Sequence, residues 1–261
     1  MVGSESQNDQ MIREGKSKIE RFKSLKETAK MRYIISDIHG CKKQYLELLE
    51  KIKFSDQDHL YILGDSVDRG EQSIEVLRYI MKQKNVTYIL GNHDYTLYLF
   101  VKQLGLDLDD FKNDEIKWSF KFWQYDGGLP TIEGFLALSE YERNEIYEFI
   151  ENANVYVEIE HEGKRYILSH AGIMNFEEEK PLEEYSYEDF FEGRMDYDTR
   201  YYQDENVYII SGHTPTVYLR KDKKPLVFQE NGHIVIDCGC VYGGNLAAFC
   251  IETGEITYVK G

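Results

Sequence analysis

Five segments of this chain place aspartate, asparagine or histidine beside glycine, directly after a run of apolar residues. The segments are Asp37-Ile38-His39-Gly40, Gly64-Asp65, Gly91-Asn92-His93-Asp94, His170-Ala171-Gly172 and Gly212-His213. Each apolar run has the length and composition of a buried strand. Because ligands of open α/β sheets bind beyond the carboxyl ends of the strands, we expect the five segments to meet at one site.

The side chains of these segments suit two divalent metal ions. Mixed carboxylate, amide and imidazole ligands favour manganese, iron or zinc over calcium. The predicted ligands are Asp37, His39, Asp65, Asn92, His170 and His213. Asp65 has two carboxylate oxygens and could bridge the ions. Two ions about 3.5–4 Å apart can activate a water at neutral pH to attack phosphorus, so no serine or cysteine nucleophile is needed.

The geometry of the first segment follows from the period of a strand. If the extended conformation continues through Asp37 and His39, their side chains lie on the same face. On the same reasoning His93 diverges from Asn92 on an extended segment. We therefore predict that His93 is not a ligand but a general acid for the leaving oxygen.

Other residues near these segments suit phosphate binding and orientation of the acid. Arg69 and Arg194 can each hold phosphate oxygens through a forked guanidinium. Either Asp68 or Asp94 could orient the imidazole of His93, and we favour Asp68. A second group of residues is expected at the edge of the site or away from it: Tyr242 as a substrate contact, Asp237 behind the ligands, and His59, His161 and His233 as structural or exposed side chains.

Composition limits the class of protein. The chain has 261 residues, of which 42% are hydrophobic and 30% charged, as in an ordinary globular protein. Its net charge of −16 argues against stable nucleic-acid binding, which requires a basic face. No apolar run approaches the roughly 20 residues of a membrane helix, and no signal peptide is visible, so we expect a cytoplasmic protein that binds no membrane.

The cysteines give a weaker signal. Cys41, Cys238, Cys240 and Cys250 lack the paired spacing of a zinc site. We expect reduced thiols, as is usual in the cytosol. Cys238 and Cys240 flank one glycine and could touch, which leaves a redox role open.

The chain reads as one domain after a polar leader. Residues 1–30 form a polar N-terminal extension that we expect to be mobile, and residues 31–261 form the domain. Strands over 33–35, 60–63 and 86–90 alternate with helices over 45–52 and 74–81, which predicts a parallel sheet with right-handed crossovers. Residues 95–150 read as a helical excursion beside the site that could shape substrate choice.

The second half predicts shorter strands. Residues 154–160 and 165–169 alternate like an antiparallel hairpin that turns at Glu162-Gly163. Further strands are expected over 207–211, 233–237, 246–251 and 256–259. We predict that they form a second, mixed sheet facing the first.

Taken together as an ordered set, these motifs resemble the phosphoprotein phosphatase branch of the calcineurin-like metallophosphoesterases, in its bacterial and phage form. The resemblance runs through the five segments, Asp65 to Gly70, and the closing stretch Asp237 to Gly244. It implies an α/β fold (α+β by some schemes), a two-sheet β-sandwich flanked by helices, with a dinuclear centre that usually holds manganese. It also implies the ligands and roles given above. Arg194 corresponds to a Trp-x-Arg motif that here reads Glu192-Gly193-Arg194, and Asp94 replaces a glutamate common in eukaryotic members.

The resemblance leaves several functions open. The first is a serine/threonine protein phosphatase that acts on phosphorylated proteins or small phosphoesters through a metal-activated water. The alternatives are a symmetrical dinucleoside tetraphosphatase and an RNA-end or cyclic-nucleotide phosphoesterase. A non-enzymatic binding module is disfavoured, because every expected ligand and both arginines are present.

Overall fold

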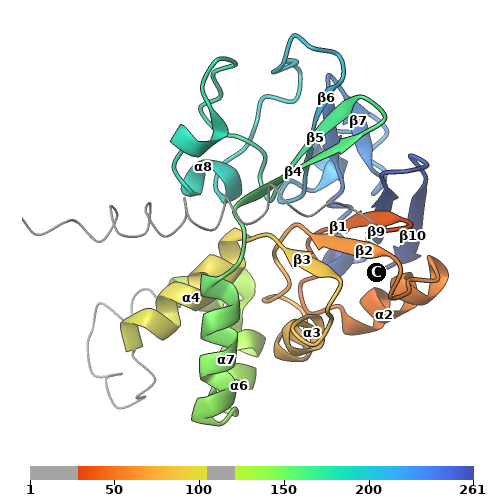
Figure 1. Ribbon diagram of the computed structural model, residues 1–261. Coiled ribbons are helices and arrows are strands. Elements are labelled where there is room, and N and C mark those ends of the chain that lie inside the picture. The colour runs from red at the N-terminus through yellow and green to blue at the C-terminus, as the bar shows by residue number, and fades with distance from the viewer. Residues whose placement is uncertain (1–28, 105–120) are drawn as a thin grey trace, which may run out of the picture.

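A computed structural model describes residues 29–104 and 121–261 as two five-stranded sheets with helices on their outer faces (Figure 1). The predicted N-terminal extension, apart from its last two residues, and part of the predicted excursion lie outside the described residues. The two-sheet α/β fold expected from the sequence is confirmed.

The first sheet has the order β10-β9-β1-β2-β3. Its parallel part consists of β1 (Arg32–Ile35), β2 (His59–Ile62) and the edge strand β3 (Val86–Tyr88), connected by α2 (Lys42–Lys51) and α3 (Ser73–Ile80). The predicted parallel sheet is therefore present. The apolar stripe of α2 buries Tyr45, Leu48 and Leu49 against it, as the helical spacing predicts.

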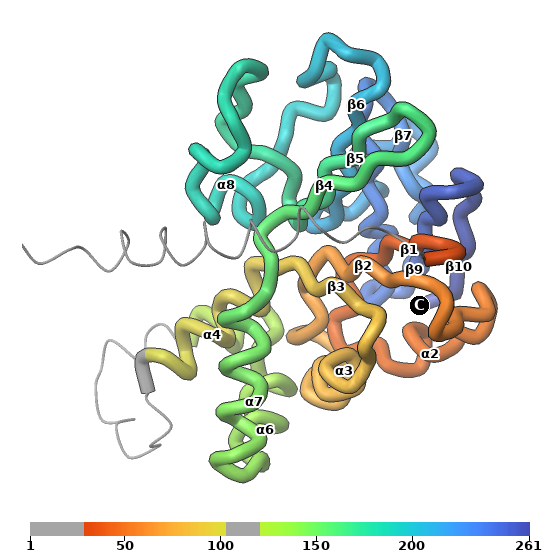
Figure 2. The backbone as a smooth tube through the Cα atoms, in the orientation of Figure 1, coloured from red at the N-terminus to blue at the C-terminus, as the bar shows by residue number. Residues whose placement is uncertain are grey.

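The position of the last two strands differs from the prediction. β9 (Asn245–Cys250) and β10 (Ile256–Lys260) belong to the first sheet, because β9 pairs antiparallel with β1 through Ile34 and Phe249. Figure 2 shows this as the blue end of the chain beside the red strand β1. The prediction that these strands join the second sheet is wrong, since period and composition identify a strand without identifying its partner.

The second sheet has the order β4-β5-β6-β8-β7. β4 (Tyr156–His161) and β5 (Lys164–Ser169) form the predicted hairpin, and Glu162 and Gly163 take the positive φ angles that its turn requires. β6 (Val207–Ser211) and β8 (His233–Val235) continue it in parallel, and β7 (Phe228–Glu230) closes the edge antiparallel to β8. β7 has no counterpart among the predicted strands.

Three apolar clusters hold the layers together. One lies between the sheets and includes Ile34, Leu63, Leu168 and Ile210. A second lies between the first sheet and its helices, and a third covers the outer face of the second sheet. The sheets therefore meet face to face, and their strand ends open on a shared edge.

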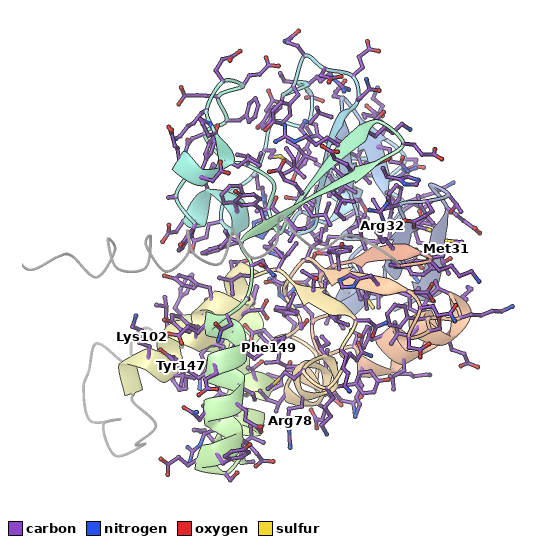
Figure 3. All side chains as sticks on the ribbon, in the orientation of Figure 1. Met31, Arg32, Arg78, Lys102, Tyr147 and Phe149 are labelled. Atoms are coloured by element: carbon purple, nitrogen blue, oxygen red, sulfur yellow. The ribbon has the colours of Figure 1, made fainter. Side chains whose placement is uncertain are left out.

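The predicted excursion is helical where the structure describes it. It contains α4 (Asn92–Leu104), one turn of π-helix named η2 (Gln124–Gly128), α6 (Leu129–Leu136) and α7 (Glu140–Glu151). A capping box formed by Ser139 and Glu142 starts α7. Glu142 also accepts a 2.6 Å bond from Arg78 of α3, a residue labelled in Figure 3, and so ties α7 to the sheet layer.

The remaining helices are short. They are η3 (Leu182–Glu184), α8 (Glu188–Phe191), η4 (Thr216–Tyr218) and η5 (Cys240–Tyr242). Across residues 29–104 and 121–261, no helix has the length and apolar character needed to cross a membrane.

Candidate metal and phosphate site

The strand ends of the two sheets meet in a buried cluster centred on Asp65. Asp65 Oδ2 lies 3.4 Å from His170 Nε2 and 3.6 Å from His39 Nε2. Asp65 follows β2, His39 follows β1 and His170 follows β5, so both sheets contribute. All three side chains are buried. The predicted convergence of separate strand ends is therefore observed.

The backbone reaches this arrangement by left-handed turns and not by continued strands. β1 ends at Ile35, and Asp37 and His39 have φ angles of 51° and 42°. Asp65 and His213 are also left-handed, at 52° and 64°. The expectation that extended geometry runs through Asp37 and His39 is wrong. Left-handed backbone costs a non-glycine residue about 1–2 kcal/mol, and such strain collects at functional sites.

Glycines beside the ligands allow this close approach of loops. A Cβ on Gly212 would overlap the side chains of Ser36 and Asp37, and a Cβ on Gly64 would lie 2.6 Å from the Cα of Gly91. His213 N donates a 3.0 Å hydrogen bond to Asp37 Oδ2. The repeated pairing of a glycine with a polar residue is therefore a packing requirement of the site.

Hydrogen bonds orient two of the imidazoles toward the centre. His39 Nδ1 is 2.7 Å from the Val67 carbonyl, and His170 Nδ1 is 2.6 Å from the Leu63 carbonyl. Because a carbonyl only accepts, each Nδ1 carries a proton, and each Nε2 is the atom that the neutral ring would offer to a metal ion. This is the arrangement of metal-ligating histidines.

A group of acceptor atoms at the centre fits a cation. Asn92 Oδ1 lies 3.0 Å from His170 Nε2 and 3.0 Å from His213 Nδ1, and the two nitrogens are 3.2 Å apart. An amide oxygen cannot donate, so these atoms repel one another unless a proton or a cation lies among them. The donor set therefore fits a divalent ion.

Two groups of ligand atoms share Asp65. One contains His39, Asp65 and His93, and the other contains Asp65, His170 and His213, with the chosen atoms of each group within 4.8 Å of one another. A shared carboxylate is the expected feature of a bridging ligand. Asp37 is in neither group, although it lies against His213 N.

The pKa values of the imidazoles support this chemistry. Burial lowers the pKa of His39 to about 3, and burial together with the charge of His170 lowers that of His213 to about 3. Both are therefore neutral, as ligands must be. Burial also opposes a charge on His170, but the Asp65 carboxylate outweighs it and raises the pKa of His170 to about 10. A cation beside Asp65 would take the place of that proton.

His93 is held by Asp68. Its Nδ1 lies 2.6 Å from Asp68 Oδ2, whereas Asp94 accepts backbone bonds from Asp65 N at 2.8 Å and Gly91 N at 3.1 Å. The choice of Asp68 over Asp94 thus agrees with the contacts. Burial opposes a charge on His93, but Asp65 and then Asp68 raise its pKa.

Asn92 and His93 begin helix α4, so the prediction that they lie on an extended segment is wrong. Successive side chains on a helix also diverge, by about 100°. His93 Nε2 is 4.0 Å from Asp65 Oδ2, close to the centre but outside the group formed by Asn92.

Arg69 spans the mouth of the site. Its Nη2 lies 2.7 Å from His93 Nε2, and its Nη1 contacts His39 Nε2. Its side chain is 24% exposed, so part of it is accessible to a ligand. The exposed ring of Tyr242 lies against it, with the guanidinium carbon 5.6 Å from the ring centroid.

No hydrogen bond or ion pair joins Arg194 to a candidate ligand among the contacts described. Arg194 is exposed in the loop after α8, and its positive charge contributes to lowering the pKa of His213. Its role as a phosphate ligand stays a prediction.

Two residues at the site were missed as functional candidates. Trp123 donates its indole N–H to Asp68 Oδ2 at 2.7 Å, and Asp126 Oδ2 lies 3.6 Å from His93 Nε2. The sequence signal was the stretch Asp126-Gly127-Gly128, which marks a turn inside the excursion but does not indicate what the turn contacts.

The other predicted residues have mainly structural contacts. His59 contacts Thr87, His233 contacts Thr199, and buried Asp237 accepts from Gly239 N. The four cysteines are free thiols, and burial raises the pKa of Cys238 to about 12. No disulfide joins any two of these four cysteines.

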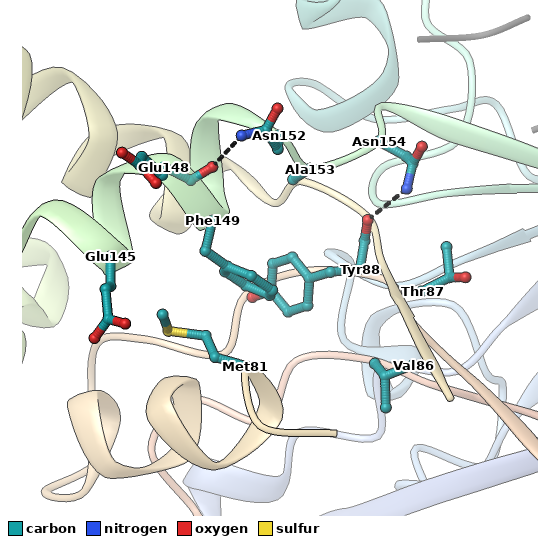
Figure 4. Close-up of a pocket in the computed structure, with 10 residues that line it drawn as sticks. All are labelled: Met81, Val86, Thr87, Tyr88, Glu145, Glu148, Phe149, Asn152, Ala153 and Asn154. Atoms are coloured by element: carbon teal, nitrogen blue, oxygen red, sulfur yellow. Dashed lines mark hydrogen bonds between the residues drawn. The ribbon is translucent and has the colours of Figure 1, made fainter. Parts of the chain in front are cut away.

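A separate pocket lies between β3 and α7 (Figure 4). Its lining includes Met81, Tyr88, Phe149 and the carboxylates Glu145 and Glu148. None of its ten lining residues is a candidate ligand, so it is distinct from the strand-end site.

The chain is similar in sequence to known phosphoesterases. A family model described as calcineurin-like phosphoesterase matches residues 32–236. The bis(5'-nucleosyl)-tetraphosphatase PrpE (asymmetrical) of Halalkalibacterium halodurans is 30% identical over 256 residues, which cover 87% of this chain and 92% of that protein. The symmetrical bis(5'-nucleosyl)-tetraphosphatase of Buchnera aphidicola is 51% identical over 67 residues, which cover 25% of this chain and 24% of that protein.

Among solved structures, that of a candidate diadenosine tetraphosphatase is similar in fold. It has a TM-score of 0.61 and 21% identity, with 90% of this chain and 95% of that chain covered. A serine/threonine phosphatase from Saccharomyces cerevisiae has a TM-score of 0.53 and 13% identity, with 96% and 87% covered. Both likenesses concern the fold alone.

Proposed function

Because the chain belongs to the calcineurin-like phosphoesterase family, and is thus a metallophosphoesterase, we propose that it hydrolyses dinucleoside polyphosphates. The observation that carries the proposal is the similarity to the Halalkalibacterium tetraphosphatase, which extends over 92% of that protein. This favours the alternative drawn from the sequence over its first reading, a serine/threonine protein phosphatase. The similarity to the yeast phosphatase does not offset it, because it concerns the fold alone.

In this proposal the six strand-end side chains would hold two divalent ions, and Asp65 belongs to both groups of candidate ligand atoms. Manganese is the metal we favour, with iron or zinc as alternatives for the same ligand types. The ions would supply a nucleophilic water and polarise the phosphate. The neutral imidazoles and the acceptor atoms around Asn92 Oδ1 support this assignment.

The remaining side chains would orient the phosphate and assist the leaving group. Arg69 and Arg194 bind phosphate oxygens, and His93 protonates the leaving oxygen from Nε2. In the structure Arg69 Nη2 is 2.7 Å from that nitrogen, so Arg69 must turn toward the phosphate before His93 can donate. Asp68 keeps the proton on His93 Nδ1 and stabilises the charged ring.

An exposed aromatic ring beside Arg69 suits a nucleoside. Tyr242 is 67% exposed, and the guanidinium carbon of Arg69 lies 5.6 Å from the centroid of its ring. Stacking on an aromatic ring is worth about 1–3 kcal/mol for a nucleobase. A dinucleoside substrate could therefore place a base on Tyr242 while its phosphate chain crosses Arg69.

A substrate panel tests the proposal. The purified full-length protein with manganese would be assayed against diadenosine tetraphosphate, a serine phosphopeptide and a 2',3'-cyclic nucleotide. We expect the highest kcat/KM for the tetraphosphate, and product analysis distinguishes symmetrical cleavage to two ADP from asymmetrical cleavage to ATP and AMP. A higher kcat/KM for the phosphopeptide would favour the serine/threonine protein phosphatase instead.

A cytoplasmic location stays a prediction.

A further inference from the structure

Asp126 places a carboxylate where a phosphate would approach Arg69. Its Oδ1 lies 3.7 Å from Arg69 Nη2, and its Oδ2 lies 3.6 Å from His93 Nε2. The side chain is 51% exposed, so it stands between these two groups and the solvent. An anionic substrate that reaches Arg69 must therefore come close to a fixed negative charge.

The segment that carries Asp126 is fixed to the site. The Gly127 carbonyl accepts a 2.7 Å bond from Arg69 N, and Gly127 has a φ angle of 95°. A Cβ at Gly127 would lie 2.7 Å from Arg69 Cγ, so only glycine permits this contact. On the other side of Asp126, Trp123 is bonded to Asp68. Asp126 is thus held at the mouth by its neighbours on both sides.

The position of Asp126 does not suit a metal ligand. Asp126 is in neither group of ligand atoms around Asp65, and its carboxylate instead lies against Arg69 Nη2 and His93 Nε2. Asp126 can therefore affect a substrate through its negative charge. A carboxylate at this distance attracts Arg69 and repels a phosphate on the same nitrogen.

We propose that Asp126 is a specificity-determining residue that disfavours doubly charged terminal phosphates relative to singly charged internal ones. A phosphomonoester carries nearly two negative charges above its second pKa of about 6. A phosphate esterified or linked on two sides, such as an internal phosphate of a dinucleoside polyphosphate, carries one. The repulsion from Asp126 therefore weighs more heavily on the monoester. This inference rests on the proposed role of Arg69 as a phosphate ligand and refines the proposed substrate class.

A pair of aryl phosphates with the same leaving group tests the inference. Nitrophenyl phosphate is a monoester, and bis(nitrophenyl) phosphate is a diester with one charge. In Asp126→Asn, which keeps the shape and removes the charge, we expect the ratio of kcat/KM for the monoester to that for the diester to rise about two- to fivefold, the range of half-exposed charge pairs. The increase should shrink at high salt, because exposed charges are screened.

Two variants serve as controls. Asp126→Glu keeps the charge and should keep the wild-type ratio. Glu158→Gln removes a carboxylate from an exposed ion pair with Arg165 on the β4–β5 hairpin, and should also leave the ratio unchanged. An unchanged or lower ratio in Asp126→Asn, or an equal rise in Glu158→Gln, would overturn the inference.

The test is independent of the nucleoside. If the protein fails to hydrolyse diadenosine tetraphosphate but the aryl phosphate ratio shifts, the proposed substrate is wrong and the role of Asp126 stands. If the tetraphosphate is hydrolysed and the ratio does not shift, the proposed substrate stands and the role of Asp126 is wrong. Binding of inorganic phosphate to the manganese-loaded protein, followed by calorimetry, gives a second measurement, in which Asp126→Asn should bind about two- to fivefold more tightly.

Discussion

Trp123 donates its indole N–H to Asp68 Oδ2 at 2.7 Å, and the same oxygen lies 2.6 Å from His93 Nδ1. One carboxylate oxygen thus accepts from a residue of the helical excursion and from the proposed acid. Both side chains around it are buried, so the interaction is poorly screened. The excursion therefore takes part in orienting His93.

Trp123→Phe tests this connection. The substitution keeps the buried aromatic packing and removes the donor, so Asp68 holds the His93 ring less firmly. We expect kcat to fall about fivefold, which corresponds to about 1 kcal/mol. Phe122→Leu, which alters a neighbouring ring that is 76% exposed, should leave kcat unchanged. A melting curve for each variant distinguishes a local change from unfolding, and a folded Trp123→Phe with wild-type kcat would contradict the connection.

Asp68→Asn should shift the pH dependence of the reaction. A general acid must be protonated, so activity is lost as pH rises through the pKa of His93. Burial lowers that pKa, whereas Asp65 and Asp68 raise it above the usual value. Removing the Asp68 charge should lower the pKa of His93, because less negative charge then opposes the effect of burial. The alkaline limb of the kcat profile should therefore move to lower pH. The measurement is a kcat profile from pH 5 to 10, and a limb that stays in place or moves upward would exclude this role.

His93→Asn should affect substrates according to their leaving groups. An alkoxide or nucleoside phosphate oxygen needs a proton as it departs, whereas nitrophenolate departs readily without one. We expect a loss of about 10²–10⁴ in kcat for an alkyl phosphate and a much smaller loss for nitrophenyl phosphate. Parallel assays on the same preparation supply the control. Equal losses on both substrates would remove His93 as the acid.

The sequence identifies which residues gather at the site better than how the backbone presents them. Alternation of apolar strands with helices predicted the parallel sheet, and parallel strands share one carboxyl edge, so Asp65 and Asn92 could be placed together. The left-handed turns at Asp37 and His39 could not be predicted. Their conformation depends on the adjacent loop, where His39 N donates to Asp65 O at 2.9 Å.

Contacts between distant segments account for the other differences. β9 reads as a strand, but its pairing with β1 depends on residues more than two hundred positions away. Asp126 is likewise an ordinary turn residue in the sequence. It reaches Arg69 only because the Gly127 carbonyl bonds Arg69 N. Local patterns carry no information about such partners.

Gly212→Ala tests whether the glycines beside the ligands are required for packing. An added Cβ would overlap the side chains of Ser36 and Asp37, both buried. We expect a loss of about 1–3 kcal/mol in the free energy of unfolding, as for other overpacked positions, together with weaker metal binding. Urea unfolding and metal titration measure the two effects. Gly163→Ala, in a turn with open space around the added atom, controls for the loss of glycine itself, although its positive φ adds strain. If Gly212→Ala and the wild type have the same free energy of unfolding and the same metal affinity, the loop can relax around the added atom.

Metal binding should release protons, because His170 is charged in the metal-free protein. The Asp65 carboxylate outweighs burial and raises the pKa of His170 to about 10, whereas His39 and His213, with pKa values lowered to about 3, are already neutral. At pH 8 manganese must displace the His170 proton, so at least one proton should be released and affinity should rise about tenfold per pH unit. Calorimetric titrations in buffers of different ionisation enthalpy count the protons. When manganese binds, the His170→Gln variant should release about one proton fewer than the wild type. The His213→Gln variant should still release the proton of His170. Binding without proton release would contradict the displacement of a proton from His170.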